Sequence, residues 1–434
     1  MLPHVIGILG ILACFALMFL GMPIGFAFGL VGAVGLCFLT TIGGGLASLP
    51  MISFDFVSNY TLTCLPMFIL LGLIIAESGM AIDLFSMAYK WLGRVRGGLA
   101  VATIIACGFF GAVSGAATAS AATMGSICYP EMKRYGYDPA LATGAIAIGA
   151  TMDVMIPPSN LMIIYCLLTD VSIGKLFFAG FVPGILEVII FGVAIFFMTS
   201  RKPALAPVAD AAFPMKEKIK SLLAMGPILL IILVVFGGMY SGIFTATEAG
   251  ACGAAATILV TIGMRRLHRR TFANSVINTL RITAAVFMLI IGAVIFNSFI
   301  AATGLARALT VWVSNANLSP LMFIFLILLL YLPLGALMDE AAMVLLTIPI
   351  YLPTLKAFHI DLIWFGILIM LSCQIGLIAP PVGMVVFVVK AVVKDVSLGT
   401  IFRGCFPFIL VAIGVLLLLV LVPELSLVFV SRMK

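Results

Sequence analysis

Charged side chains are scarce in this chain: Asp, Glu, Lys and Arg make up 9% of its 434 residues, whereas apolar residues make up 64%. A soluble domain is typically about 25% charged and about 45 to 50% apolar, so a water-exposed globular protein is excluded. Each bilayer crossing needs roughly 20 apolar residues, and the length leaves room for about ten crossings. The composition therefore predicts an all-α, polytopic membrane protein.

Several motifs for chemistry are absent as well. The histidines His4, His268 and His359 fall at a terminus or in polar segments, which excludes an intramembrane metalloprotease. The nine cysteines occur singly, without a C-x-x-C pair, and fit buried hydrophobic positions rather than a metal site or disulfides. The sequence lacks G-x-x-x-x-G-K-[ST], so uphill transport would have to use an ion gradient. No organic cofactor is expected.

The apolar segments predict the topology. Ten of them fit membrane crossings, near residues 2–21, 23–42, 61–78, 140–168, 174–199, 221–240, 247–263, 283–300, 362–393 and 397–423. Two more, 97–128 and 318–350, contain small or charged interruptions and are long enough to enter the bilayer and return. We predict a re-entrant helical hairpin for each of them.

The basic residues indicate the orientation. With both hairpins returning to the side they left, 18 of the 23 Lys and Arg residues fall on one side, and the other five are Lys175, Arg307, Lys356, Arg432 and Lys434. The positive-inside rule makes the first side cytoplasmic and both termini periplasmic, as in a bacterial inner-membrane protein. The net charge of +7 is thereby explained without a nucleic-acid partner. The amphipathic segments Ala81–Arg96 and Thr271–Arg281 fit interfacial helices at the lipid surface, or plain cytoplasmic helices.

Motifs recur in the same order along the two halves of the chain, at offsets of about 223 to 225 residues. Residues 156–160, Ile-Pro-Pro-Ser-Asn, pair with residues 379–383, Ala-Pro-Pro-Val-Gly. The other pairs are 170–177 with 395–402, Pro130 with Pro353, Asp138 with Asp361, and Ser78-Gly79 with Thr303-Gly304. Five predicted crossings per half is an odd number, so the second copy is expected to be inverted.

This repeat divides the chain into a first half, 1–199, a cytoplasmic linker, 200–220, and a second half, 221–434. Each half is expected to hold one hairpin and one broken helix, which are 97–128 with 140–168 and 318–350 with 362–393. Inverted repeats with paired discontinuous helices are typical of secondary transporters.

The double prolines explain why the helices would break. Pro157, Pro158, Pro380 and Pro381 lack an amide hydrogen and clash with the preceding turn, which leaves carbonyl groups unpaired in an apolar crossing. Each such carbonyl would cost several kcal/mol in lipid, so it has to face protein, water or an ion. A proline kink covered by a neighbouring helix is the alternative. Two sites at matching positions favour an ion or substrate site.

The first hairpin has a tip of small and hydroxyl residues around Ser114, Gly115, Thr118 and Ser120. A half-helix starting there would present free amides to an anion, and the end of the other half-helix would present carbonyls to Na⁺. A small-residue stripe for helix packing is the alternative. The predicted substrate-binding residues are Ser114, Gly115, Thr118, Ser159, Asn160, Pro380 and Pro381.

The second hairpin places two carboxylates, Asp339 and Glu340, within an apolar segment. A charge at the bilayer centre costs roughly 2.5 to 3.5 kcal/mol, so a partner is expected. Glu340 could instead lie at the aqueous mouth, whereas Glu187 and Glu248 fit helix interfaces or ends. The candidate Na⁺ ligands are Ser114, Ser120, Asp153, Pro157, Gly335, Asp339, Ala379 and Gly383.

These motifs resemble the large membrane subunit, DctM-like, of tripartite ATP-independent periplasmic (TRAP) transporters over essentially the whole chain. The most specific segments are 65–68, Leu-Pro-Met-Phe, Ser114-Gly115, Tyr129–Asp138, Ile156–Ser159 and Ala379–Gly383. One departure is Asp153, where the family pattern suggests a small residue, and this leaves the chemistry of that pocket open.

The resemblance implies an elevator-type transporter, in which hairpins and broken helices slide against a scaffold and carry a small organic anion inward with Na⁺. It implies two partners, a periplasmic substrate-binding protein and a small four-helix membrane subunit, here expected to be a separate chain. A stand-alone symporter or channel is the alternative. A rhomboid-type enzyme is disfavoured because Ala112-Val113-Ser114-Gly115 lacks the first glycine of G-x-S-G.

Overall fold

A computed structural model describes residues 3–114, 116–207 and 213–432, and for Ala81, residues 112–114 and Arg432 it describes the backbone only. All regular structure in this described part is helical. Seven of its helices are long and apolar enough to cross a membrane, or eight if the bent pair Met215–Ala224 and Gly226–Tyr240 forms one span. The predicted all-α, multi-pass membrane protein is confirmed.

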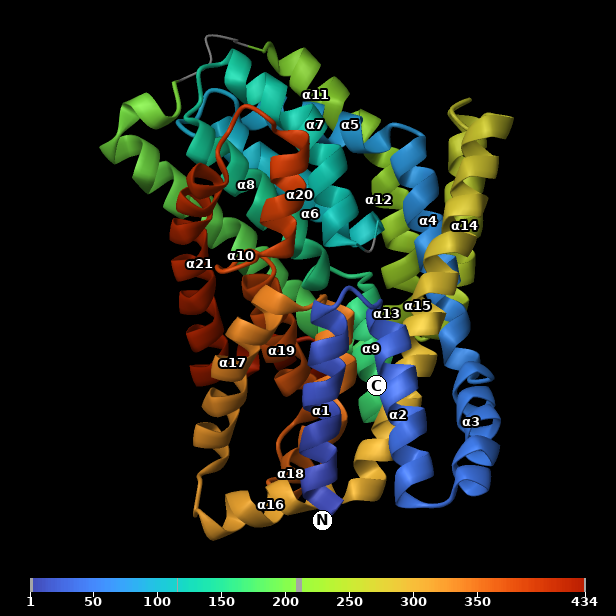
Figure 1. Cartoon of the computed structure of the whole chain (residues 1–434). Coiled ribbons are helices and arrows are strands. Elements are labelled where there is room, and N and C mark those ends of the chain that lie inside the picture. The colour runs from blue at the N-terminus through green and yellow to red at the C-terminus, as the bar shows by residue number, and fades with distance from the viewer. Residues whose placement is uncertain (1–2, 115, 208–212, 433–434) are drawn as a thin grey trace.

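One group of helices packs around the longest helix of the chain, α15 (Arg269–Thr303). Its members are α1 (Pro3–Phe19), α2 (Ile24–Leu39), α3 (Ile42–Val57) and α4 (Cys64–Glu77), and α14 (Ala246–Gly263) joins this group through α4. Helix α2 runs along α15, and α4 packs against both α14 and α15. In Figure 1, α15 extends from the end of the molecule opposite the N-terminus toward the N-terminal end.

Two helix pairs form the predicted hairpins. The first consists of α6 (Gly98–Ser114) and α7 (Ala117–Arg134), and the second of α17 (Pro320–Leu337) and α18 (Glu340–Ala357). Figure 1 shows the first pair in the end of the molecule away from the N-terminus and the second pair in the N-terminal end. The turns of both pairs therefore lie toward the middle of the molecule.

Both predicted broken helices are interrupted at the double prolines. The first runs from α8 (Pro139–Thr151) through a short 3₁₀ turn η2 (Met152–Val154) to α9 (Asn160–Thr169). The second runs from α19 (Leu362–Gly376) to α20 (Met384–Val392). Gly383, before α20, has φ +60°, a left-handed conformation that favours glycine.

The remaining helices complete the two ends of the fold. They are α5 (Met80–Leu92), α10 (Ile173–Arg201), α11 (Met215–Ala224), α12 (Gly226–Ile232), the π-helical turn η4 (Leu233–Gly237), α13 (Gly238–Tyr240), α16 (Leu305–Asn315), α21 (Leu398–Leu421) and α22 (Glu424–Leu427), with 3₁₀ turns η1 (Tyr60–Thr63), η3 (Pro203–Leu205) and η5 (Val430–Arg432). Glu248 accepts from the amide of Thr245 at 2.8 Å and caps α14, so it is a helix-end residue as predicted.

Several segments differ from the sequence prediction. Helix α3 lies outside the predicted crossings, because its Gly-rich start and internal Pro50 weaken the helical signal. The amphipathic segment Thr271–Arg281 and the crossing 283–300 are one continuous helix, because no proline or glycine separates them. The linker 200–220 contains most of α11, and α16 is a further amphipathic helix that the prediction omitted.

Residues that the sequence repeat aligns have matching structural roles. Asp138 caps the N-terminus of α8, and Asp361 caps that of α19, each accepting from two backbone amides. Gly79 and Gly304 both have positive φ, +77° and +68°, where a long helix turns into an amphipathic one. The two prolyl pairs likewise lie at the two helix interruptions. The internal similarity is therefore present in local structure as well as in sequence.

An exposed ion pair connects the first hairpin to the second half of the chain. The Nζ of Lys133, at the end of α7, lies 2.5 Å from Oδ2 of Asp395 in the loop before α21. Hydrogen bonding to this ammonium holds the pKa of the Asp395 carboxyl below its usual value of about 3.9. The pair stabilises the fold fully above that value, and its contribution is lost as the pH falls through the lower folded-state pKa.

We expect Asp395→Asn to remove this part of the pH dependence and to change stability at neutral pH only slightly, because the pair is exposed. The measurement is the unfolding temperature in detergent across acid to neutral pH. Asp55→Asn is the matched control, since Asp55 is exposed and forms no ion pair among the described residues. If the unfolding temperature of Asp395→Asn falls with decreasing pH as much as that of the wild type, the ion pair with Lys133 is not the cause of this pH dependence.

Candidate functional site

A cavity of about 210 Å³ lies where the turns of the two hairpins meet. Five elements line it, and each contributes from its end or from one face: the start of α7, the start of α9, the start of α18, the end of α19 and a face of α15. The lining residues are Ala116, Ala117, Thr118, Asn160, Leu161, Ile164, Ile282, Ala285, Val286, Leu289, Asp339, Glu340, Ala341 and Leu377. The structure therefore brings predicted site residues from both halves together.

One wall of this cavity favours an anion. The N-termini of α7 and α9 both line it, and the side chains of their N-cap residues, Ala116 and Ser159, make no cap hydrogen bond within the described part of the chain. Helix N-termini carry partial positive charge and amides that intrahelical bonds do not use, and they bind carboxylates and phosphates for that reason. Thr118 adds a hydroxyl on this wall. The predicted anion-binding residues Thr118 and Asn160 lie here.

Another part of the lining, here called the acidic wall, carries the carboxylates. Asp339 caps α18 and accepts from the amide of Ala341 at 3.1 Å, and Glu340 follows it into the cavity. The buried Asp153 interacts electrostatically with both carboxylates from η2, and its Oδ1 has no hydrogen-bond partner among the described residues. The end of α19 adds the negative end of a helix dipole at Leu377. Glu340, left open by the sequence, lies at the cavity.

This acidic wall is not a complete metal cage of side chains. Within the described residues, no group of three or more His, Cys, Asp or Glu side chains has the geometry to hold a metal ion. A Na⁺ ion at Asp339 or Asp153 would need additional oxygen ligands, and the interrupted segments around residues 155–159 and 377–383 are where backbone carbonyls leave the helical ladder. The donor set present is therefore carboxylate plus backbone oxygen.

The wall formed by α15 does not follow from the sequence pattern. Ile282, Ala285, Val286 and Leu289 follow the i, i+3, i+4, i+7 spacing of one helix face. In a sequence, an apolar face of this kind predicts contact with lipid or with the protein core. Periodicity alone therefore does not identify it as part of a binding site. The small residue Ala285 is the only weak signal, because it leaves space where a larger side chain would fill the cavity.

The other predicted residues on the first hairpin have different positions. Ser114 ends α6 and only its backbone is described, and Gly115 lies outside the described residues. Ser120 is buried and donates to the carbonyl of Cys107 at 3.1 Å, so its hydroxyl links α7 to α6. Ser159 is buried at the start of α9 but does not line the cavity.

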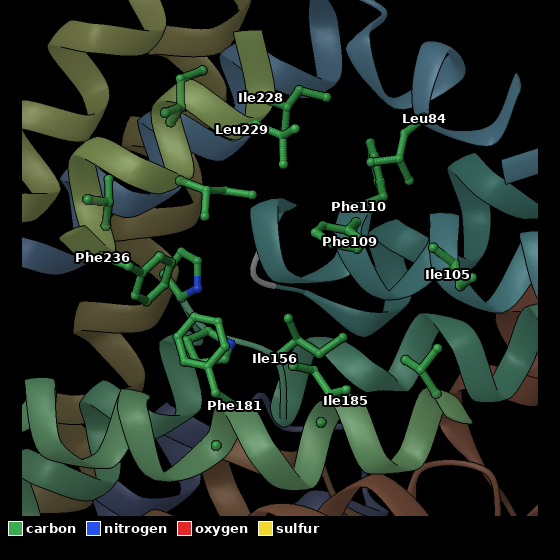
Figure 2. Close-up of a pocket in the computed structure, with 18 of the residues that line it drawn as sticks. Leu84, Ile105, Phe109, Phe110, Ile156, Phe181, Ile185, Ile228, Leu229 and Phe236 are labelled. Atoms are coloured by element: carbon green, nitrogen blue, oxygen red, sulfur yellow. The ribbon is translucent and has the colours of Figure 1, made fainter. Parts of the chain in front are cut away.

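The residues of the prolyl segments also lie away from the cavity. Pro380 and Pro381 are exposed, Ala379 is half-buried, and Gly383 is buried before α20. Pro157 lines a different, larger cavity of about 430 Å³ between α4, α6, α10 and α12. Figure 2 shows that aromatic and aliphatic side chains line this second cavity, among them Phe109, Phe181 and Phe236. Its apolar lining makes it unsuitable for a charged solute.

Gly335, a predicted Na⁺ ligand, has a clear packing role. A Cβ at Gly335 would lie 2.7 Å from the Cα of Gly376, and a Cβ at Gly376 would lie 2.6 Å from the Cα of Gly335. The two glycines therefore let α17 approach the end of α19, next to the interruption and to the cavity residue Leu377.

We expect Gly335→Ala to destabilise the protein by about 1 to 3 kcal/mol, because the added methyl group overpacks this helix contact. Thermal unfolding in detergent measures the effect. Gly414→Ala is the matched control, because Gly414 lies within α21 with no atom within 4 Å of an added Cβ, and alanine there is expected to be neutral or stabilising. Equal unfolding temperatures for the two variants would contradict the close packing.

Comparison with known proteins places this architecture in a family. The chain matches the family described as the tripartite ATP-independent periplasmic transporter, DctM component, over residues 11–425. The chain belongs to this DctM family. The resemblance inferred from its motifs is confirmed, and the protein is a TRAP transporter large permease rather than an enzyme.

Two relatives align with this DctM family member over most of the length of both chains. It is 33% identical to the C4-dicarboxylate TRAP transporter large permease protein DctM of Pseudomonas aeruginosa over 383 residues, or 88% of each chain. It is 31% identical to the sialic acid TRAP transporter large permease protein SiaM of Vibrio cholerae, over 95% of each chain. The YdaH transporter of Alcanivorax borkumensis has a similar fold, with a TM-score of 0.62, 13% identity and 98% coverage of both chains.

Proposed function

We propose that this permease imports a small organic carboxylate together with Na⁺, through the cavity between the two hairpins. The observation that carries the proposal is the division of that cavity into an anion-favouring wall, at the starts of α7 and α9, and an acidic wall at Asp339 and Glu340. The relatives named for C4-dicarboxylate and for sialic acid transport agree with a carboxylate substrate.

The charge balance of the cavity supports Na⁺ coupling. No Lys or Arg is among the described residues that line it, so an organic anion there would be repelled by the carboxylates of Asp339 and Glu340 and by the nearby Asp153. Bound Na⁺ removes this repulsion, and the ion therefore binds before the substrate or with it. Two Na⁺ ions neutralise a dianion, and a third makes import responsive to voltage, at about 2.3 kcal/mol per charge and 100 mV.

The arrangement of the helices supports an elevator movement. We propose that the hairpins α6–α7 and α17–α18 and the broken helices α8–α9 and α19–α20 form the moving part, related by an inverted repeat over 1–199 and 221–434. Helices α1, α2, α4, α14 and α15 form the scaffold. The supporting observation is that α15 contributes a single apolar face to the cavity, against which the other four lining elements could slide. One hydrogen bond would have to break in this movement, the one that Asn297 Nδ2 of α15 donates to the carbonyl of Leu345 in α18 at 3.2 Å.

The family context supports the partners and the location. We propose that the chain works in the bacterial inner membrane, with both termini periplasmic, and assembles with a small four-helix membrane subunit and a periplasmic substrate-binding protein. Dependence on the binding protein separates this function from the alternative, a stand-alone symporter or channel.

Reconstitution tests the proposal. The substrate is first identified as the ligand that stabilises the associated binding protein in a thermal-shift screen of small carboxylates. The permease and the small subunit are then placed in liposomes, with the loaded binding protein outside. We expect accumulation above the external concentration only with an inward Na⁺ gradient. Accumulation that persists without Na⁺ would falsify Na⁺ coupling, and equal uptake without the binding protein would favour the stand-alone symporter.

A further inference from the structure

Outside the cavity, the structure buries one more acidic side chain. Glu187 of α10 is fully buried, and its Oε1 accepts a hydrogen bond of 3.0 Å from Nε2 of Gln374 on α19, which is also fully buried. The sequence placed Glu187 at a helix interface, and this is confirmed. The contact joins the two halves of the chain, because α10 belongs to the first half and α19 to the second.

Two oxygen atoms of this pair lack a donor. Neither Glu187 Oε2 nor Gln374 Oε1 has a hydrogen-bond partner among the described residues, and both atoms are inaccessible to solvent. A buried acceptor without a donor costs about 1 to 3 kcal/mol, and more for a charged group. The pair therefore needs one further hydrogen-bond donor.

Within the described part of the chain, no cationic side chain fills this need. The ion pairs of the described residues are Lys133 with Asp395 and Arg266 with Asp83, both remote in sequence and exposed to solvent at least in part. Among described side chains on the helices packed against α10, the charged ones are Arg403 and Glu424, which are both exposed. The other titratable groups there are thiols and one phenol, at Cys107, Tyr165, Cys166, Cys373 and Cys405.

A metal cation does not fit the site either. Glu187 and Gln374 offer two free side-chain oxygen atoms, and the carbonyl of Gln374 in the last turn of α19 could add a third, whereas a helical hydrogen bond occupies the carbonyl of Glu187 within α10. Hard cations take about six oxygen ligands. A proton needs one oxygen to bind and one acceptor to receive its hydrogen bond, and the pair supplies both.

We propose that Glu187 and Gln374 form a proton-binding site, in which the carboxyl group retains one proton on Oε2 and pairs with the amide as a neutral acid. The acid O–H faces the carbonyl oxygen of Gln374, while the amide N–H donates to the second carboxyl oxygen. Gln374 lies two residues before α19 ends at Gly376, and Leu377 then lines the cavity. The protonated pair therefore positions one wall of the transport cavity from a distance.

Infrared difference spectroscopy on the purified full-length protein at neutral pH tests whether the Glu187 carboxyl group is protonated. The spectrum of wild type minus Glu187→Gln is expected to show the loss of a protonated carboxylic acid carbonyl band and no loss of carboxylate bands. Glu248→Gln is the control, since Glu248 is an exposed cap and is expected to lose carboxylate bands instead. Loss of carboxylate bands in Glu187→Gln would overturn the proposal.

Sodium provides the second arm of this test. The acid band is expected to be the same with and without NaCl, because the site holds a proton rather than Na⁺. A band that disappears on Na⁺ addition would instead assign Glu187 to a Na⁺ site. Neither result depends on transport, so a failure here is distinguishable from a failure of the proposed import function.

Two further variants keep the proposal testable if Glu187→Gln folds poorly. Gln374→Leu retains the acid and removes its partner, so the carbonyl band is expected to remain and to move to higher frequency as its hydrogen bond is lost. Glu187→Ala leaves the Gln374 amide unpaired and is expected to lower the unfolding temperature, whereas the amide of Glu187→Gln preserves a donor and the wild-type value. An unshifted band in Gln374→Leu would contradict the pairing.

Discussion

Replacing Asp339 by asparagine is expected to raise the Na⁺ concentration that gives half-maximal uptake by roughly 30-fold or more. Removing one partner of a buried charge pair costs about 2 to 5 kcal/mol, and each 1.4 kcal/mol is a factor of ten. The fold should be retained, because asparagine caps helices about as well as aspartate and can still accept from the amide of Ala341. The substitution therefore separates the charge of Asp339 from its capping role.

Asp361→Asn is the matched control for this experiment. Asp361 caps α19 in the same way, accepting from the amides of Ile363 and Trp364 at 2.8 and 2.9 Å, but it is exposed and lies outside the cavity. Its replacement should leave both uptake and Na⁺ dependence unchanged. If the two variants behave alike, Asp339 has only a capping role and the acidic wall does not bind Na⁺.

Filling the cavity from α15 is expected to have an even larger effect. Ala285 lines the cavity, and Ala285→Trp would place an indole ring into a volume of about 210 Å³. We expect uptake in reconstituted liposomes to fall to the background level, roughly 100-fold or more, because the substrate and the indole ring compete for the same space. The unfolding temperature of the variant should stay near that of the wild type.

The neighbouring alanine gives the control. Ala284 is also exposed on α15 but does not line the cavity, since one residue turns a helix by about 100°. Ala284→Trp should transport like the wild type. Normal uptake by Ala285→Trp would show that substrate does not pass through this cavity.

Much of the fold could be predicted because a few residues limit the backbone in identifiable ways. Each double proline removes two amide donors, so the interruptions at residues 155–159 and 377–383 follow from the sequence. The caps Asp138 and Asp361 fix where the following helices start. Helix α3 was missed because its glycines and Pro50 lower helix propensity, which tertiary packing against α2 and α15 overrides.

The site was predictable only in part. Asp339 and Asn160 are polar residues in apolar segments. Because a polar side chain is costly to place in the bilayer, such residues can be identified as site candidates from the sequence. The α15 wall around Ala285 depends on which helix face meets two hairpin turns that are distant in sequence, and local periodicity carries no such information. Ser120 and Gly335 carry functional signals in the sequence, but the structure gives Ser120 a hydrogen bond to Cys107 and Gly335 a close contact with Gly376.

The most direct test of the transport site is a cryo-electron microscopy map of the permease complex with Na⁺ and the substrate identified from the binding protein. The account predicts substrate density in the cavity, with its carboxylate at the starts of α7 and α9, and cation density beside Asp339. Substrate density in the apolar cavity around Phe109 and Phe181, or a cavity between the hairpins that stays empty at saturating substrate, would contradict it.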